Sequence, residues 1–60
     1  MIMQVLRLPA VMKKTGLARA TIYAHIAQGS FPAPIKLGPR ASGWVEAEVD
    51  GWLAAKVAAR

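Results

Sequence analysis

The side chains of this 60-residue chain that are best suited to chemistry are polar or basic, and one group of them shares a helix-compatible stretch. Arginine and glutamine side chains recognise guanine and adenine, and alanine or a threonine methyl group contacts the methyl group of thymine. A helix whose outward side is this small and polar can enter the major groove of DNA. The candidate DNA-contacting residues of this stretch are Arg19, Ala20, Thr21, Tyr23, Ala24 and Gln28.

The roles of four of these residues have alternatives. Arg19 is expected either to recognise guanine or to hold a phosphate. Tyr23 is expected either at the boundary of the core or against a phosphate, because its ring can pack while its hydroxyl reaches the surface. Ala20 and Ala24 are equally consistent with simple helix formation, since alanine is the strongest helix former.

A second group of candidate DNA-contacting residues lies further along the chain, at Lys36, Arg40 and Ser42. Residues 35–37 alternate apolar, basic and apolar, which predicts a strand, and residues 38–43 have turn composition throughout. Residues 44–45 supply a second short strand. The segment is therefore predicted to form a hairpin whose tip carries Arg40 and Ser42. Arg40 there suits a phosphate or the minor groove, and Lys36 suits a phosphate.

The sequence indicates no catalytic or metal-binding constellation. It has no cysteine, so disulfides and thiolate metal ligands are excluded. His25 has only Ser30 and Ser42 as conceivable partners, and three isolated residues do not make a catalytic triad. Glu46 and Asp50 lie one turn apart, but two oxygen ligands are fewer than a hard metal ion usually requires. We therefore expect no enzyme activity, no metal, no cofactor and no small-molecule substrate.

The charge of the chain favours an anionic partner. Eight basic and three acidic side chains give a formal charge of +5, and all three acids lie between Glu46 and Asp50. Residues 1–45 therefore carry no acidic side chain, which makes them the expected anion-facing part. Nucleic acid and an anionic membrane surface are the two candidates. The clearest amphipathic helix begins with acids, which disfavours the membrane.

The length of the chain fits one domain, spanning residues 1–60, and its small core predicts marginal stability. No apolar run approaches the roughly 20 residues that span a bilayer. Residues 1–7 are too short for a signal peptide and lack its order of a charged and then an apolar segment. A cytoplasmic protein is therefore expected.

Three helices are expected to position the candidate residues. The first covers residues 9–15, because proline suits the first turn of a helix and Gly16 can end it. The second covers residues 18–28, with Gly29 closing it in a left-handed conformation. The third covers residues 46–59, and its carboxylates near the N-terminus favour the positive end of the helix dipole. The expected fold is mainly α with a small β-hairpin.

The apolar pattern predicts the core. In the second helix, three residues spaced by four share one face, although the first of them, Ala18, lacks a side-chain oxygen for capping. Phe31 lies in a proline-rich connector and is expected to plug the core. Residues 1–8 are either a strand or an extended lead-in. The apolar stripe of the third helix is Val45, Val49, Trp52 and Leu53, with Val57 as an open case.

Two further details concern polar side chains. Lys13 and Lys14 are expected to point towards water or towards a phosphate. His25 is expected to be packed or half-exposed rather than functional.

Gly51 lies inside the third helix, where it costs nearly 1 kcal/mol relative to alanine and is expected to permit close packing.

Short motifs extend along nearly the whole chain. They are Leu6-Arg7-Leu8-Pro9, Thr15-Gly16-Leu17, Thr21-Ile22-Tyr23, Gly29-Ser30-Phe31-Pro32-Ala33-Pro34, Leu37-Gly38-Pro39-Arg40, Gly43-Trp44 and Glu48-Val49-Asp50-Gly51-Trp52-Leu53. In this order and spacing they resemble the AlpA-like family of small phage and prophage regulators. That family is related to excisionases and to the DNA-binding head of MerR-type regulators.

The resemblance implies a winged helix-turn-helix of three helices and a two-stranded wing. Family members bind DNA as transcription activators, repressors or excision factors. By this resemblance, Arg19, Thr21 and Tyr23 fall on the recognition helix and Arg40 falls on the wing. The sequence departs from the family pattern at Ala18, where a capping serine is common, and at Ala24, where a basic residue is common.

The function expected from these observations is sequence-specific binding of double-stranded DNA, in a bacterial or phage-infected cell. The recognition helix, residues 18–28, would enter the major groove, and the wing, residues 35–45, would contact the backbone or the minor groove. A second copy of the chain on an adjacent site is a further conceivable partner. The alternative is a protein-interaction module that keeps the fold without strong DNA binding, which the apolar excess and the two tryptophans motivate.

Overall fold

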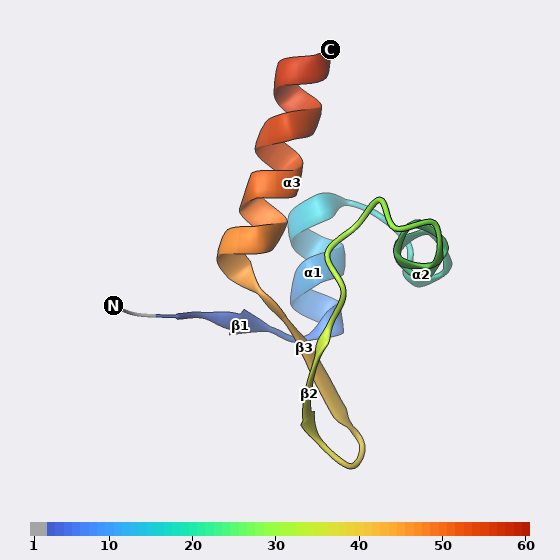
Figure 1. The fold of residues 1–60 in the computed structure, drawn as a ribbon, viewed down its shortest axis with the longest axis vertical. Helices are drawn as coiled ribbons and strands as arrows, with labels where there is room; N and C mark the ends of the chain where they lie inside the picture. Colours follow the sequence, from blue (N-terminus) through green and yellow to red (C-terminus); the bar gives the residue numbers. More distant parts are fainter. Residues whose placement is uncertain (1–2) are drawn as a thin grey trace.

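The computed structural model of the protein describes residues 3–60, which form three helices and a small antiparallel sheet. Figure 1 shows the elements and their arrangement. In chain order they are β1 (Val5–Leu6), α1 (Leu8–Thr15), α2 (Arg19–Ala27), β2 (Ile35–Gly38), β3 (Ala41–Val45) and α3 (Glu46–Ala59). This mostly helical arrangement with a hairpin confirms the predicted winged helix-turn-helix fold.

The sheet has β3 at its centre, with β1 on one side and β2 on the other. β1 pairs antiparallel with β3, so that Leu6 lies opposite Trp44, and the segment before the first helix is therefore a strand rather than a lead-in. β2 pairs antiparallel with β3 and places Lys36 opposite Ser42. The two-stranded wing predicted from the sequence is thus extended by a third strand.

The hairpin turn is shorter than predicted. Only Pro39 and Arg40 lie outside the strands, whereas the composition indicated a turn over residues 38–43. The prediction that Ser42 lies at the tip is therefore wrong, because Ser42 is paired in β3. Turn composition indicates where a chain reverses but not where pairing resumes, and a two-residue loop is a common hairpin connection.

Gly43 allows β1 to approach β3 closely. A Cβ atom at this position would lie 2.5 Å from Cγ1 of Val5 and 3.2 Å from the carbonyl oxygen of Leu6. Real Cβ atoms do not come this near a neighbouring carbon, so any larger residue would displace the first strand. Gly51, in contrast, has no atom within 4 Å of such a Cβ, and the prediction that it permits close packing is wrong.

The helix ends follow the local sequence closely. Pro9 lies in the first turn of α1, and Gly16 ends this helix with a φ of 73° while its N–H donates to the carbonyl of Met12. α2 begins one residue later and ends one residue earlier than predicted, because Ala18 and Gln28 are its capping residues. Ala18 has extended geometry and makes no side-chain capping hydrogen bond, as its side chain predicts. Gly29 has the expected left-handed conformation, with a φ of 76°.

The core lies where α1, α2, β3 and α3 meet. Phe31 plugs it as predicted, and the indole N–H of Trp44 donates to the carbonyl of Pro32 over 3.0 Å. Val57 is 56% exposed and Ala18 is exposed, so both lie outside the core. The buried residues are Val11, Ile22, Phe31, Trp44 and Val49. The half-buried apolar residues packed on them are Leu6, Leu8, Met12, Leu17, Ile26, Trp52 and Leu53.

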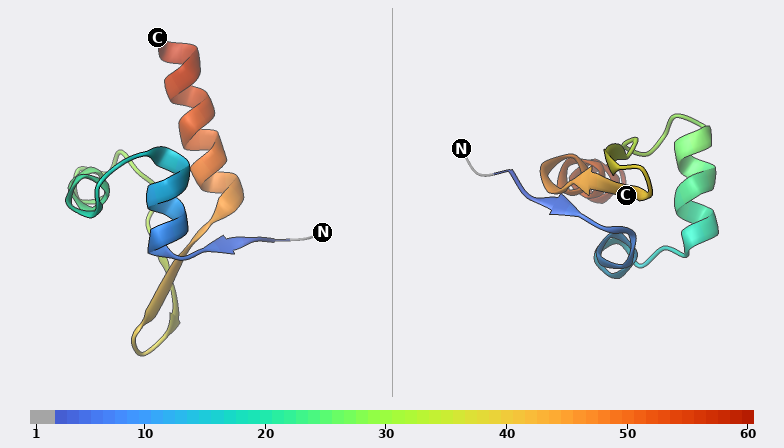
Figure 2. Two further views of the ribbon diagram at one scale, coloured as in Figure 1. Left: turned by 180° about the vertical axis from the view of Figure 1, so that it is seen from behind. Right: turned by 90° about the horizontal axis from the view of Figure 1, so that it is seen from below.

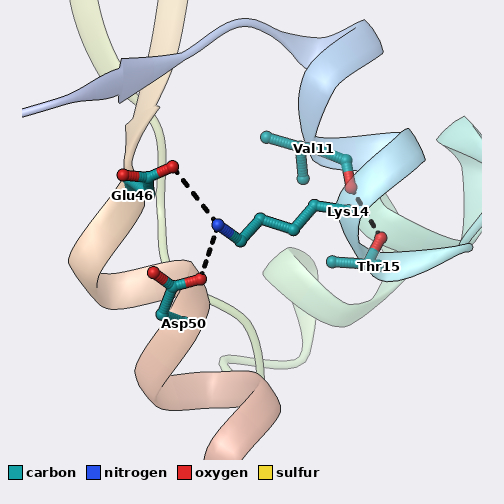
Figure 3. Close-up of polar contacts among 5 residues, drawn as sticks. All are labelled: Val11, Lys14, Thr15, Glu46 and Asp50. Carbon is teal, nitrogen blue, oxygen red and sulfur yellow. Dashed lines mark hydrogen bonds and ion pairs between the residues drawn. The ribbon is translucent and has the colours of Figure 1, made fainter.

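Lys14 links α1 to the start of α3 (Figure 3). Its Nζ lies 3.2 Å from Oε2 of Glu46 and 2.7 Å from Oδ1 of Asp50. Hydrogen bonds to Asp50 and then to Glu46 raise the pKa of Lys14 above its ordinary value of 10.5. Lys14 is exposed, as the prediction that it points towards water requires, but its ammonium group is ion-paired with two carboxylates that were expected only to favour the helix dipole. The sequence does not predict these ion pairs, because Lys14 and the two carboxylates lie far apart in the chain and meet only when α1 and α3 pack together.

The arrangement of the helices leaves α2 and the hairpin projecting from the rest of the chain. α1 and α3 run along the long axis, whereas α2 is seen end-on in Figure 1 and lengthwise in the view from below in Figure 2. The C-terminus of α3 lies at the opposite end of the molecule from the hairpin tip (Figure 1). No helix in residues 3–60 has both the length and the apolar character that crossing a membrane requires.

Candidate nucleic-acid interface

A hollow of about 310 Å³ lies between the start of α1, α2 and the hairpin. We call it the arginine hollow, because one arginine from each of these three regions lines it. Figure 1 shows α2 beside α1 and the hairpin projecting below them, so the hollow is lined by residues from segments far apart in the sequence. The residues that line the arginine hollow are Arg7, Leu8, Pro9, Arg19, Tyr23, Arg40, Ser42 and Trp44.

The wall formed by α2 rests on the core. Arg19 is the first residue of α2, and its Cζ lies 5.9 Å from the centroid of the Tyr23 ring. The Tyr23 ring in turn packs edge-on against Trp44, with 6.3 Å between the ring centroids. Because Trp44 is only 1% exposed, this series of contacts holds Arg19 on a rigid base. Tyr23 itself is 42% exposed, so it takes the predicted boundary position while its side chain stays accessible from the hollow.

The charge of the arginine hollow is uniformly positive. Three arginine residues line it, and its lining includes no acidic residue. Two of the three acids of the chain, Glu46 and Asp50, face Lys14 on the other side of α1. The ion pairs found in residues 3–60 involve Lys14 only, so Arg7, Arg19 and Arg40 keep their charge open to an external anion.

The remaining candidate residues of α2 lie outside the arginine hollow but on the accessible surface. Ala20, Thr21, Ala24 and Gln28 are all exposed. Gln28 caps the C-terminal end of α2, at the far end of the helix from Arg19. These four side chains therefore leave the outward surface of α2 small and polar, as predicted. Their contact with bases stays a prediction.

The hairpin places its basic residues at two levels. Arg40 lies in the two-residue turn, at the tip as predicted. Lys36 is exposed on β2, opposite Ser42, and directly opposed residues of an antiparallel pair project to the same face. Ser42 lines the arginine hollow and Lys36 does not. The two residues thus share a face but differ in their distance from α2.

Arg7 is the site residue that the sequence analysis did not identify. It lies directly before α1 and has extended geometry, with its carbonyl accepting the N–H of Val11. The available signal was its position as a single basic residue between apolar Leu6 and Leu8, which favours an exposed side chain on an anchored backbone. Only the pairing of β1 with β3 brings this side chain to the hairpin.

The His25 region is structural. Nδ1 of His25 lies 3.3 Å from Oγ of Ser30, and the Ser30 hydroxyl donates to the carbonyl of His25. The indole N–H of Trp52 donates to the carbonyl of Ser30, and the Trp52 ring packs edge-on against Phe31. His25 is half-buried, as predicted, and belongs to the anchoring of the connector after α2. Ser42 lies in the arginine hollow instead.

Comparison with known proteins identifies relatives over nearly the whole chain. The model of a family described as Prophage CP4-57 regulatory protein (AlpA) matches residues 4–57. The DNA-binding transcriptional activator AlpA of Escherichia coli strain K12 is 50% identical over 56 residues, covering 83% of this chain and 80% of that protein. An uncharacterized protein, ORF88, of Enterobacteria phage P4 is 44% identical over 55 residues, covering 92% of this chain and 62% of that protein.

Proposed function

The chain belongs to the AlpA family of prophage regulatory proteins, and on that premise we propose that it binds double-stranded DNA sequence-specifically. It acts as a transcriptional regulator or an excision factor of a phage or mobile element. The name of the Escherichia coli relative, a DNA-binding transcriptional activator, supports the regulatory role. The role is one of binding and not of catalysis.

The observation that carries the proposal is the arginine hollow between α2 and the hairpin. Arg19 at the start of α2 and Arg40 at the hairpin tip line the same concave surface. A recognition helix needs an adjacent basic element that holds the phosphate backbone while its side chains contact base edges. The presence of Arg19 and Arg40 on one concave surface therefore supports a DNA interface built from α2 and the hairpin.

Helix α2 is the proposed recognition helix. Arg19 lies at its N-terminal end, where side chains of recognition helices first reach base edges. The exposed residues that follow are small enough for close approach to the floor of the major groove, and their chemistry suits thymine methyl groups and adenine. The proposed base-contacting residues are Arg19, Ala20, Thr21, Ala24 and Gln28, with Tyr23 beside them at the backbone.

The hairpin is the proposed wing. Arg40, at its tip, contacts a phosphate or enters a narrow minor groove, which attracts arginine by its negative potential. Lys36 and Ser42 contact phosphates from the face of the hairpin that they share. These contacts fix the orientation of the protein and add affinity for any duplex.

The alternative function, a protein-interaction module, was suggested by the apolar excess and by the two tryptophans, and the second of these observations no longer supports it. Trp44 is buried and Trp52 is half-buried against Phe31, so neither tryptophan is free to anchor a partner. Apart from Tyr23 in the arginine hollow, the exposed large apolar residues are Met3, Val5, Ile35, Leu37 and Val57. These exposed apolar side chains are the remaining argument for a protein-interaction module, and they do not outweigh the arginine hollow.

The test is selection of bound sites from a random duplex pool, followed by titration of a selected and a scrambled duplex at several salt concentrations. We expect the selected duplex to bind at least tenfold more tightly, and the logarithm of both affinities to fall linearly with the logarithm of salt concentration. The stoichiometry of the same titration reports whether a second copy occupies an adjacent site. Equal, salt-independent affinity for both duplexes would overturn the proposal and favour the interaction module.

A further inference from the structure

We infer that Arg7 and Arg40 form a clamp that holds one phosphate group of the DNA backbone in the arginine hollow, beside Arg19, which reaches the base edges from the start of α2. The inference rests on the proposed function and adds to it a contact from the β1–α1 junction. It therefore assigns a role to a region that belongs to neither the recognition helix nor the wing.

The shape of the arginine hollow suits a single phosphate. Its volume of about 310 Å³ corresponds to roughly ten water molecules at about 30 Å³ each, which is room for a phosphate and the edges of its two sugars. Its lining includes Trp44, which belongs to the core, and Leu8, which packs on the core. A backbone phosphate can therefore enter it without any rearrangement of the fold.

The chemistry of the lining matches a phosphate. A guanidinium group presents N–H donors in a planar fork that fits phosphate oxygens, and Arg7 and Arg40 line the arginine hollow from two different segments of the chain. The hydroxyl groups of Ser42 and Tyr23 add neutral donors beside them. Since no carboxylate lines the arginine hollow, a bound anion meets no like charge there.

Arg7 is held in place by the fold on both sides. Leu6 before it is paired with Trp44, and its own carbonyl accepts the N–H of Val11 over 3.1 Å. The backbone is thus fixed while the side chain is exposed. Because Arg19 at the start of α2 lines the same hollow, a phosphate bound to Arg7 and Arg40 would set the depth at which α2 enters the groove.

The test combines a protein variant with a DNA variant. The charge of each backbone phosphate near the selected site is removed in turn with a methylphosphonate, and each duplex is titrated with wild-type protein and with Arg7→Gln. We expect Arg7→Gln to bind the unmodified duplex about tenfold more weakly and to lower the salt slope by about one unit. At one methylphosphonate position the two proteins should bind equally, since the charge that Arg7 contacts is gone.

The control is Arg60→Gln, which removes the same charge at the C-terminal end of α3, opposite the hairpin tip (Figure 1). It should keep both the affinity and the methylphosphonate profile of the wild type. Arg7→Lys keeps the charge but loses the fork, and should fall between wild type and Arg7→Gln. It also serves as the test variant if Arg7→Gln melts at a lower temperature than the wild type.

The outcomes separate the inference from the function on which it rests. If the wild type binds the selected duplex but neither Arg7 variant changes affinity or salt slope, the clamp is wrong and the proposed function stands. If Arg7→Gln weakens binding equally at every methylphosphonate position, Arg7 acts only through general charge and the clamp is also wrong. If the wild type binds no duplex, the proposed function fails and the clamp fails with it.

Discussion

The two ends of α1 carry positive charge in opposite ways. At its C-terminal end, Lys14 lies between Glu46 and Asp50 and its charge is neutralised within the fold. At its N-terminal end, Arg7 lies with two other arginines in a hollow whose lining includes no carboxylate. The difference teaches that a net charge of +5 does not describe the binding surface. The placement of the acids on α3 does, because it leaves the α2 and wing side uncompensated.

The largest effect is expected from Trp44→Ala, which removes a core residue that also lines the arginine hollow. Its deletion should lower the free energy of unfolding by about 3–5 kcal/mol, which is enough to unfold most of a domain this small. Thermal melting followed by circular dichroism measures the loss. The control Val57→Ala, at an exposed apolar position, should melt within a few degrees of the wild type.

Two glycine variants separate the sheet from α3. Gly43→Ala places a Cβ against Val5 and should lower the free energy of unfolding by about 1–3 kcal/mol, with weaker DNA binding because Arg7 directly follows β1. Gly51→Ala, in open space inside α3, should raise it by about 0.5–1 kcal/mol. Urea unfolding of the two variants gives both values. Equal effects of the two variants would mean that β1 does not lie against Gly43.

Two arginine variants test the division of labour within the uncompensated region. Arg19→Ala should cost about 1–3 kcal/mol of binding free energy on the selected site and relax base preference at one position. Arg40→Ala should weaken binding to all duplexes more evenly and lower the salt slope by about one unit, and Lys36→Ala should resemble it. Titrations of selected and scrambled duplexes at several salt concentrations distinguish them. If neither arginine variant alters affinity while the fold is intact, these arginines of the hollow do not bind DNA and the proposed function is wrong.

Ala18→Ser should stabilise α2 without changing the charge of the arginine hollow, so it separates the stability of α2 from its charge. Ala18 is the N-capping residue, with extended φ and ψ and no side-chain hydrogen bond to the helix. A serine hydroxyl there can accept an N–H of the first turn, which should raise the free energy of unfolding by about 0.5–2 kcal/mol. Chemical denaturation measures the gain. No gain would place the start of α2 at another residue.

The smallest effect is expected at the neutralised end of α1. The raised pKa of Lys14 means that the folded state holds this proton more tightly than the unfolded state. Its contribution to stability is therefore fully present below pH 10.5, the ordinary value, and is lost as the pH rises through the higher folded value. Melting temperatures of Lys14→Met and wild type should converge above that range, and DNA affinity at neutral pH should be unchanged. A large loss of affinity would show that Lys14 faces the DNA.

Local chemistry made much of the fold predictable. Gly16 and Gly29 mark helix ends because left-handed residues favour glycine, and Phe31 is buried because the prolines around it hold an extended connector. The Lys14 ion pairs and the contribution of Arg7 were not predictable in this way. Both depend on segments that meet only after folding, and spacing within one segment carries no signal for them.

The pairing of β1 with β3 also constrains the order in which the chain can fold during synthesis. Leu6 finds its partner only when Trp44 is available, although about three fifths of the sequence lies between them. During synthesis, α1 and α2 therefore emerge from the ribosome before the strand that anchors the N-terminal segment exists. A chain interrupted before β3 would contain the whole of α2 yet leave Arg7 unplaced, so a prematurely terminated product would lack the assembled arginine hollow.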